Sequence, residues 1–289
     1  MVAYMQHKDL ANEQLDSARG LEIRDGVHRV MDGLAAAAQR SDRNVDDIRL
    51  LAATKTRDVG EIMAAIDAGV RLIGENRPQE IEVKALRLQE LCAQQGLVLG
   101  AHQAHTAAVS NHSEASASSL TSDSSSSQDM GFHLIGQLQS NKINKVLPYV
   151  TTIESVDNLV LAERISRRAV ARGCVVGVLL EVNESGEASK SGCSPEAAQE
   201  LAYAMAAMDG IELRGLMTIG AHVDDEGRIR TGFAHLRGLR DAIVGSGESG
   251  TASCQELSMG MTHDMVYAIE EGSTIVRVGT AIFGERAFI

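Results

Sequence analysis

The feature of this sequence that most constrains its fold is a regular alternation of short apolar runs with longer amphipathic stretches. Such an alternation is typical of βα units, in which helices cover a parallel sheet. We interpret eight apolar runs as strands, at residues 48–54, 71–74, 132–136, 151–155, 175–182, 214–219, 256–259 and 275–278. Because eight parallel strands close a TIM-type barrel, the sequence predicts an α/β fold of the (β/α)8 barrel class.

Helix signals fall between the predicted strands. Capping residues and amphipathic spacing predict helices from Val59 after the cap Asp58, at 78–95, at 158–172 after the cap Asp157, at 195–208, and at 263–271 after the cap Thr262. An additional amphipathic stretch at 23–39 precedes the first strand, and we expect it to pack on the outside of the barrel.

Two segments depart from the βα pattern. Residues 1–20 are polar and mixed in charge, and we expect a flexible N-terminal extension ahead of a single barrel domain at 21–289. Residues 101–129 contain ten serines and no Lys or Arg, which predicts a disordered insertion. The histidines of this insertion, at positions 102, 105 and 112, fit a solvated loop better than a metal site.

Composition excludes several classes of partner. A net charge of −12 argues against binding nucleic acid, which requires clustered Lys and Arg. The four cysteines, at positions 92, 174, 193 and 254, lack the close spacing of a zinc site or redox pair and are typical of a reducing cytosol. The sequence contains neither a membrane-length apolar stretch nor a signal peptide, so we expect a cytoplasmic protein.

Lys55 is a lone basic residue that closes the first predicted strand. Most lysines at strand ends are solvated. A lysine that apolar neighbours desolvate has a lowered pKa and can attack a carbonyl to form a Schiff base. Lys55 is therefore a candidate anchor for an aldehyde.

The last two predicted strands are followed by loops suited to a phosphate. Residues 257–262 combine hydroxyl groups with a helix start, and Gly279-Thr280 lets the backbone approach an anion closely. A turn with a helix cap accounts for these loops equally well. Alternation along the last strand points Arg277 into the barrel, where it could bind a heteroaromatic nitrogen or pair with a structural carboxylate.

Seven motifs together resemble the pyridoxal phosphate homeostasis protein family. They appear in the family's order: ATKT at 53–56, GEN at 74–76, FHLIGQLQSNK at 132–142, SKSG at 189–192, RGLM at 214–217, LSMGM at 257–261 and VRVGTAIFG at 276–284. The resemblance covers the chain from about residue 23 to residue 286. The resemblance implies a fold like the N-terminal barrel of alanine racemase and a bound pyridoxal 5′-phosphate (PLP).

The same resemblance implies the residues that bind PLP. They are Lys55 as the Schiff-base lysine, Ser258, Met259, Gly279 and Thr280 at the phosphate, Arg277 at the pyridine nitrogen, and Asn76, His133 and Met217 beside the ring. Two of these have an ordinary structural alternative, because His133 could be a hydrogen-bonded barrel residue and Met217 a core side chain.

A cationic arginine at the pyridine nitrogen disfavours ring protonation, which makes the cofactor a poor acceptor of carbanion charge. Racemases of this fold use a tyrosine from a second domain, whereas this sequence ends directly after the eighth predicted strand. We therefore expect no catalytic residue.

The leading hypothesis is a PLP-binding protein of intracellular PLP homeostasis, without catalysis of its own. The alternative is a PLP-dependent enzyme such as a weak amino-acid racemase, and a phosphosugar-binding barrel enzyme ranks below both because it leaves Lys55 unexplained. Expected partners are PLP itself and PLP-dependent apoenzymes. The absence of a racemase-type second domain favours a monomer.

Overall fold

A computed structural model describes residues 8–100, 128–187, 191–220 and 225–285. Its strands are β1 (Arg49–Ala53), β2 (Leu72–Glu75), β3 (Val98–Leu99), β4 (Asp129–Leu134), β5 (Thr152–Val156), β6 (Val176–Glu181), β7 (Ile211–Met217), β8 (Glu256–Ser258) and β9 (Ile275–Val278). All eight predicted strands are confirmed. The additional strand, β3, was not predicted because it has only two residues and pairs only with β4.

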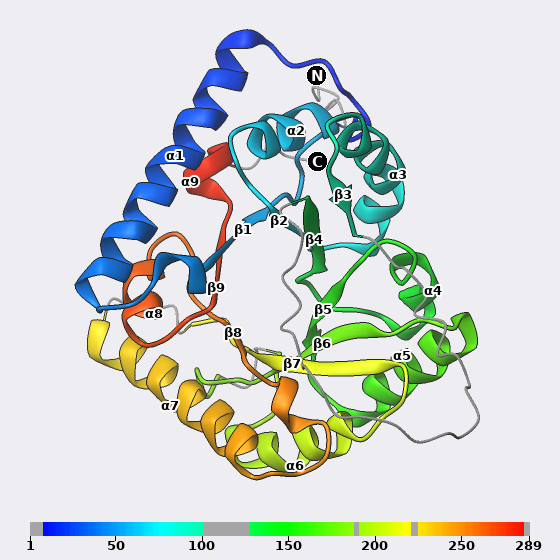
Figure 1. The fold of residues 1–289 in the computed structure, drawn as a ribbon, viewed down its shortest axis with the longest axis vertical. Helices are drawn as coiled ribbons and strands as arrows, with labels where there is room; N and C mark the ends of the chain where they lie inside the picture. Colours follow the sequence, from blue (N-terminus) through cyan, green and yellow to red (C-terminus); the bar gives the residue numbers. More distant parts are fainter. Residues whose placement is uncertain (1–7, 101–127, 188–190, 221–224, 286–289) are drawn as a thin grey trace, which may run out of the picture.

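The eight longer strands form a closed parallel barrel. Their order is β2-β1-β9-β8-β7-β6-β5-β4, and pairing of β2 with β4 closes the ring. Figure 1 shows the helices as an outer ring around these strands. The predicted (β/α)8 barrel is therefore confirmed, and the carboxyl ends of all eight strands lie on one face.

The helices are α1 (Ser17–Arg40), α2 (Val59–Asp67), α3 (Pro78–Gln94), α4 (Ile143–Val146), α5 (Leu159–Arg172), α6 (Pro195–Ala206), α7 (Glu226–Gly245), α8 (Met265–Glu270) and α9 (Thr280–Phe283). Helices α2 to α8 lie between strands, as the alternation predicts, while α1 precedes β1 and α9 follows β9. The sequence predicted neither the short helices α4 and α9 nor the longer helix α7. This helix buries only Phe233, Leu236 and Ile243, so its apolar periodicity is weak.

One of three predicted helix caps is confirmed. The Asp58 side chain accepts a hydrogen bond from the Glu61 backbone N–H at the start of α2. The prediction of Asp157 for α5 is wrong, because Asn158 occupies the cap and accepts from the Leu161 N–H. The prediction of Thr262 for α8 is also wrong, since that helix begins only at Met265. Adjacent polar residues compete for a cap, and local backbone geometry decides between them.

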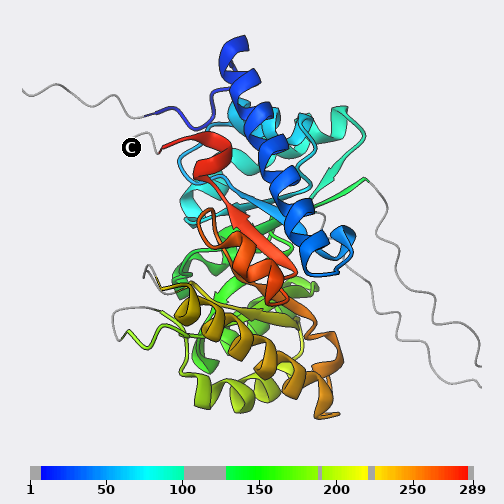
Figure 2. The same cartoon turned by 90° about the vertical axis from the view of Figure 1, so that its left-hand side faces the viewer.

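The helix predicted at 23–39 begins six residues earlier and packs against α2, α8 and α9. Figure 2 shows α1 beside the red carboxyl-terminal segment. Before α1, the carbonyl groups of Leu10 and Asn12 accept hydrogen bonds from Val59 and Gly60, the first residues of α2. The segment 8–16 therefore has defined contacts with the start of α2, while residues 1–7 lie outside the described part.

Side chains inside the barrel fall into an apolar and a polar group. The apolar group consists of Leu51, Leu72 and Ile275, with Ile135 packed against them. The larger core lies outside the strands, between them and the helices. This division leaves room for charged residues within the barrel itself.

The remaining expectations concern the serine-rich insertion, the cysteines, membrane-spanning segments and metal sites. Positions 101–127 of the predicted insertion, with its three histidines, lie outside the described residues. The four cysteines are free thiols. Among the described residues, no helix has the length and apolar character needed to cross a membrane, and no cluster of His, Cys, Asp or Glu could hold a metal ion.

Candidate site at the carboxyl ends of the strands

Lys55 lies two residues beyond the end of β1, at the carboxyl-terminal face of the barrel, and is partly buried. The preceding residue, Thr54, continues the sheet, because its N–H donates to the Gly74 carbonyl of the next strand (2.9 Å). Thr56 then adopts a left-handed backbone with φ of 64°. A fixed strand and a tight turn therefore hold Lys55 on both sides.

A buried ionic cluster supports this turn from below. The Lys84 ammonium is fully buried and donates to Glu75 (2.6 Å), Glu80 (3.1 Å) and the Thr54 carbonyl (3.2 Å). The other Glu80 contact is with the Thr56 N–H, which donates to its carboxylate (2.8 Å). Residues on both sides of Lys55 are thus bonded to the same cluster.

Burial makes Glu75 an unusual member of this cluster. Desolvation raises its pKa to about 7, against the opposing charge of Lys84. One of its oxygens, Oε2, is buried without a hydrogen-bond partner among the described residues. Sequence reasoning noted Glu75 only as part of the GEN motif and missed Lys84, because no local pattern shows that a lysine on a helix points inward.

Arg277 lies inside the barrel on β9, as alternation predicted, and is 6% exposed. Its guanidinium donates to the Ser258 hydroxyl (2.6 Å) and to the Thr218 carbonyl (2.8 Å). Burial lowers its pKa, while Glu154, Asp264 and Glu181 favour the charged form. Arg277 thus has carboxylate neighbours, as expected of a structural arginine. Its guanidinium also lies at the carboxyl ends of β7 and β8, where Thr218 and Ser258 are its partners.

Ser258 and His133 converge on one buried carboxylate, Glu154. The Ser258 hydroxyl donates to Glu154 Oε2 (2.6 Å), and His133 Nδ1 lies 2.6 Å from Glu154 Oε1. Burial alone raises the pKa of Glu154, but these hydrogen bonds and the charge of Arg277 lower it below its ordinary value. We call the series His133, Glu154, Ser258 and Arg277 the polar column.

The loop after β8 runs along strand β9. Arg277 N–H donates to the Gly260 carbonyl (3.0 Å), and Met259 N–H donates to the Ile275 carbonyl (3.1 Å). Gly260 has φ of 91°, and a Cβ there would lie 2.4 Å from the Ala268 Cβ, so only glycine fits. The first candidate phosphate loop is therefore held against the strand that leads into the second.

The remaining predicted residues occupy different depths. Asn76 and Met217 stand at the carboxyl ends of β2 and β7, and Thr280 is exposed at the start of α9. A Cβ on Gly136 would lie 2.3 Å from the Asn76 carbonyl, which explains the close approach of these two chain segments. His133 differs, because it lies within β4 and its ring lines a cavity at the opposite end of the barrel.

Glu181 is an acid at this face that sequence reasoning missed. It is the last residue of β6, pairs in register with Met217, and is 3% exposed. Desolvation and the charge of Asp157 raise its pKa to about 7, against the opposing charge of Arg277. Its carboxylate makes no hydrogen bond within the described residues. The unbroken apolar run before it was the only signal, and it indicates a strand rather than an acid.

The groups present fit a PLP-sized ligand. The face offers a primary amine, a buried guanidinium and two glycine-containing loops after neighbouring strands, which are the groups that an aldehyde, a pyridine nitrogen and a phosphate require.

The chain matches a known family over most of its length. The family described as "Alanine racemase, N-terminal domain" matches residues 34–287. A protein of Aquifex aeolicus, named "Pyridoxal phosphate homeostasis protein", is 33% identical over 262 residues, which cover 91% of this chain and 97% of the relative.

Two solved structures are similar to this chain. A structure described as that of "an unknown protein from Bifidobacterium adolescentis" has a TM-score of 0.86 and 62% identity, covering 96% of this chain and 100% of its own. PipY of Synechococcus elongatus, solved with PLP bound, has a TM-score of 0.63 and 27% identity, covering 88% and 100%.

Proposed function

The chain belongs to the pyridoxal phosphate homeostasis protein family, and on this basis we propose that it binds PLP reversibly and serves intracellular PLP homeostasis. The observation that carries the proposal is the partly buried Lys55 at the end of β1, beside a strand, β9, that holds a buried Arg277. The PLP in the PipY structure supports the same assignment.

Each group of the face has a proposed part in holding the ligand. PLP supplies an aldehyde that a lysine amine can capture covalently. Lys55 would form the Schiff base with the aldehyde, and Arg277 would donate a hydrogen bond to the ring nitrogen. Met259, Gly279 and Thr280 offer backbone and hydroxyl donors to the phosphate, with Ser258 beneath them, and Asn76 and Met217 border the ring. His133 reaches this face only through Glu154 and Ser258.

The proposal does not include catalysis. A racemase needs a second acid opposite the lysine, as tyrosine provides in racemases of this fold. Of the tyrosines in the described residues, Tyr203 and Tyr267 are on the outer helices α6 and α8, and Tyr149 follows α4. Arg277, being cationic, also opposes protonation of a neighbouring ring nitrogen.

The location and partners are part of the same proposal. Four free thiols fit a reducing cytoplasm. The protein would act as a monomer that passes PLP to PLP-dependent apoenzymes. Light scattering gives the mass in solution, and reactivation of an apoenzyme by the loaded protein measures transfer; a stable oligomer or a lack of transfer would contradict these two statements.

Borohydride reduction tests the anchor. After incubation with PLP and reduction, peptide mapping should find the adduct on Lys55. The Lys55→Ala variant should lose both the adduct and the Schiff-base absorbance, whereas Lys145→Ala, which removes a surface lysine paired with Glu82, should retain both. An adduct on another lysine would overturn the site.

Exchange of the α-hydrogen tests the racemase alternative. The loaded protein, incubated with alanine in deuterated water, should exchange the α-hydrogen no faster than free PLP does. Exchange at enzyme-like turnover, lost in Lys55→Ala, would favour an enzyme over a carrier.

A further inference from the structure

A cavity of about 460 Å³ opens at the amino-terminal end of the barrel, opposite Lys55. Its lining includes the first residues of three strands, namely Arg49 of β1, Leu72 of β2 and Asp129 of β4. This volume lies within the range of small-molecule sites. Of the residues that line this cavity, His133 is the one that the family resemblance also assigns to PLP.

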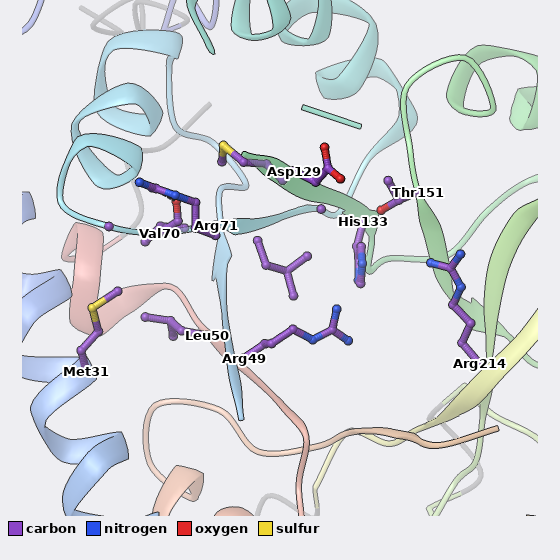
Figure 3. Close-up of a pocket in the computed structure, with 13 residues that line it drawn as sticks. Met31, Arg49, Leu50, Val70, Arg71, Asp129, His133, Thr151 and Arg214 are labelled. Carbon is purple, nitrogen blue, oxygen red and sulfur yellow. Dashed lines mark hydrogen bonds between the residues drawn. The ribbon is translucent and has the colours of Figure 1, made fainter. Parts of the chain in front are cut away.

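Three arginines line this cavity. Arg71 donates to the Ile66 and Val70 carbonyls, whereas Arg49 and Arg214 reach the cavity from two other strands. Figure 3 shows Arg49 and Arg214 with the His133 ring between them. Arg49 uses one nitrogen for Glu256 (2.5 Å), and Arg214 uses Nε for Glu212 (2.7 Å) and Nη1 for Thr152 (3.3 Å). Because a guanidinium carries five N–H donors, each retains donors that make no hydrogen bond within the described residues.

His133 presents a third unused group. It is 2% exposed, and its Nδ1 is taken by Glu154. Its Nε2 makes no hydrogen bond within the described residues, although the ring lines the cavity. This nitrogen faces the cavity, so a ligand bound in the cavity can contact it directly.

Two glycines keep the space in front of these groups open. A Cβ on Gly131 would lie 2.3 Å from Leu72 Cδ1 and 3.5 Å from His133 Nε2. A Cβ on Gly177 would lie 2.6 Å from Arg214 Cδ, so glycine lets this arginine cross the barrel. The donors and the room before them thus occur together.

We propose that this cavity binds a small organic anion, held by Arg49 and Arg214 and contacted by His133 Nε2. Glu256 binds one side of the Arg49 guanidinium, and Glu212 binds one side of the Arg214 guanidinium. Each glutamate thereby orients the remaining N–H donors of its arginine. Asp129, the acid in the lining, directs its carboxylate away from the two arginines (Figure 3). Converging N–H donors select a carboxylate or phosphate oxygen over a neutral group.

The polar column connects this anion site to the cofactor face. An anion at His133 Nε2 contacts the ring whose Nδ1 is bonded to Glu154. The Glu154 carboxylate accepts a hydrogen bond from Ser258, and the Ser258 hydroxyl accepts one from Arg277. Anion affinity and PLP affinity are therefore coupled, and by linkage each ligand changes the affinity of the other by the same factor. This coupling, unlike the anion site itself, rests on the proposed function.

Calorimetry with succinate as the probe tests the site. We expect saturable binding of one succinate, no binding of the neutral analogue succinamide, and at least tenfold weaker binding in Arg214→Gln and in Arg49→Gln. Arg164→Gln, a surface change on α5 beside Ser140, is the matched control and should bind like the unchanged protein. Inorganic phosphate, titrated in parallel, distinguishes a preference for carboxylate from one for phosphate.

Either of two results would overturn the anion site. One is the absence of saturable binding to the folded protein, and the other is binding that both arginine variants retain. For the coupling, PLP titrations with and without saturating succinate should differ at least threefold in affinity, and equal affinities would overturn it. If Lys55 captures no PLP, the succinate titrations still decide the anion site, so the two failures are distinguishable.

Discussion

Lys84 is fully buried, and its ammonium is bonded to two carboxylates and a carbonyl beneath the Lys55 turn. A buried ion pair contributes little net stability compared with apolar packing, but removal of one partner leaves an uncompensated charge. At this position the ion pair orients the backbone, because Lys84 bonds to the Thr54 carbonyl and to Glu80, which accepts from the Thr56 N–H. Lys84 therefore holds the backbone on both sides of Lys55.

Replacement of this lysine should be costly. Lys84→Met leaves Glu75 and Glu80 buried without their cation, and we expect the free energy of unfolding to fall by roughly 3–5 kcal/mol. Lys145→Ala, which breaks a half-exposed pair with Glu82, should cost less than about 1 kcal/mol. Urea denaturation measures both, and a Lys84→Met protein as stable as the control variant would contradict this account.

For single residues, the sequence predicted where a side chain lies in the barrel better than which side chains it contacts. Lys55 and Arg277 were recognised because a strand end and an alternating strand are local patterns. Lys84 and Glu181 were missed, because their burial depends on which neighbouring element covers them. A lysine on a helix is usually solvated, and nothing within a few residues of position 84 indicates otherwise.

Among the elements, α1 shows how a helix outside the barrel supports the candidate site. Ile23 and Val27 are fully buried on its inner face. Gly26 lies on the same face, against α9, which follows Gly279 directly. A Cβ on Gly26 would lie 2.7 Å from the Ile282 carbonyl and 3.0 Å from that of Ala281. The short helix that begins at Thr280 is therefore held against α1.

A methyl group at this contact should push the two helices apart. Gly26→Ala gains up to about 1 kcal/mol of helix propensity, but overpacking against the α9 backbone should exceed that gain, for a net loss of roughly 1–2 kcal/mol. PLP should also bind more weakly, because α9 carries Thr280.

Gly33→Ala is the matched control for this change. Its nearest neighbour is the flexible Met265 Cε at 3.5 Å, so it should be neutral or stabilising. Thermal unfolding and PLP titration of both variants measure the effects. Equal stability of the two variants would show that α9 yields without cost.

At the scale of the whole molecule, some buried glutamates have raised pKa values and others have lowered ones. Burial raises the pKa values of Glu75 and Glu181 to about 7 from the ordinary 4.5. Hydrogen bonds and neighbouring cations instead lower the pKa values of Glu61, Glu80 and Glu154, although burial opposes this shift. The two kinds make opposite contributions to the pH dependence of folding.

The stability of the protein should therefore be greatest near pH 5. Between about pH 4.5 and 7 the folded protein retains protons on Glu75 and Glu181 that the unfolded chain releases, so stability falls as pH rises through this window. Below pH 4.5 the unfolded chain takes up protons that Glu61, Glu80 and Glu154 resist, so stability falls as pH decreases.

Glu181→Gln isolates one part of this profile. The variant cannot ionise at position 181, so relative to the unchanged protein it should gain up to about 3 kcal/mol between pH 5 and 8. Urea denaturation across this range measures the gain. A difference between the two proteins that stays constant with pH would mean that Glu181 ionises normally when folded.

The sequence by itself determined the barrel, because the signals for strands and helices repeat locally and eight of them close a ring. It located Lys55 and Arg277 for the same reason. It did not predict α7, whose few buried side chains give little periodicity.

Only the tertiary structure decided which buried charges meet. Glu154 and Ser258 are 104 residues apart in sequence yet share a hydrogen bond inside the barrel. The structure also placed His133 on the amino-terminal cavity. Electrostatic contacts of this kind depend on the packing of four different strands. The apolar periodicity of any one strand or helix therefore cannot predict them.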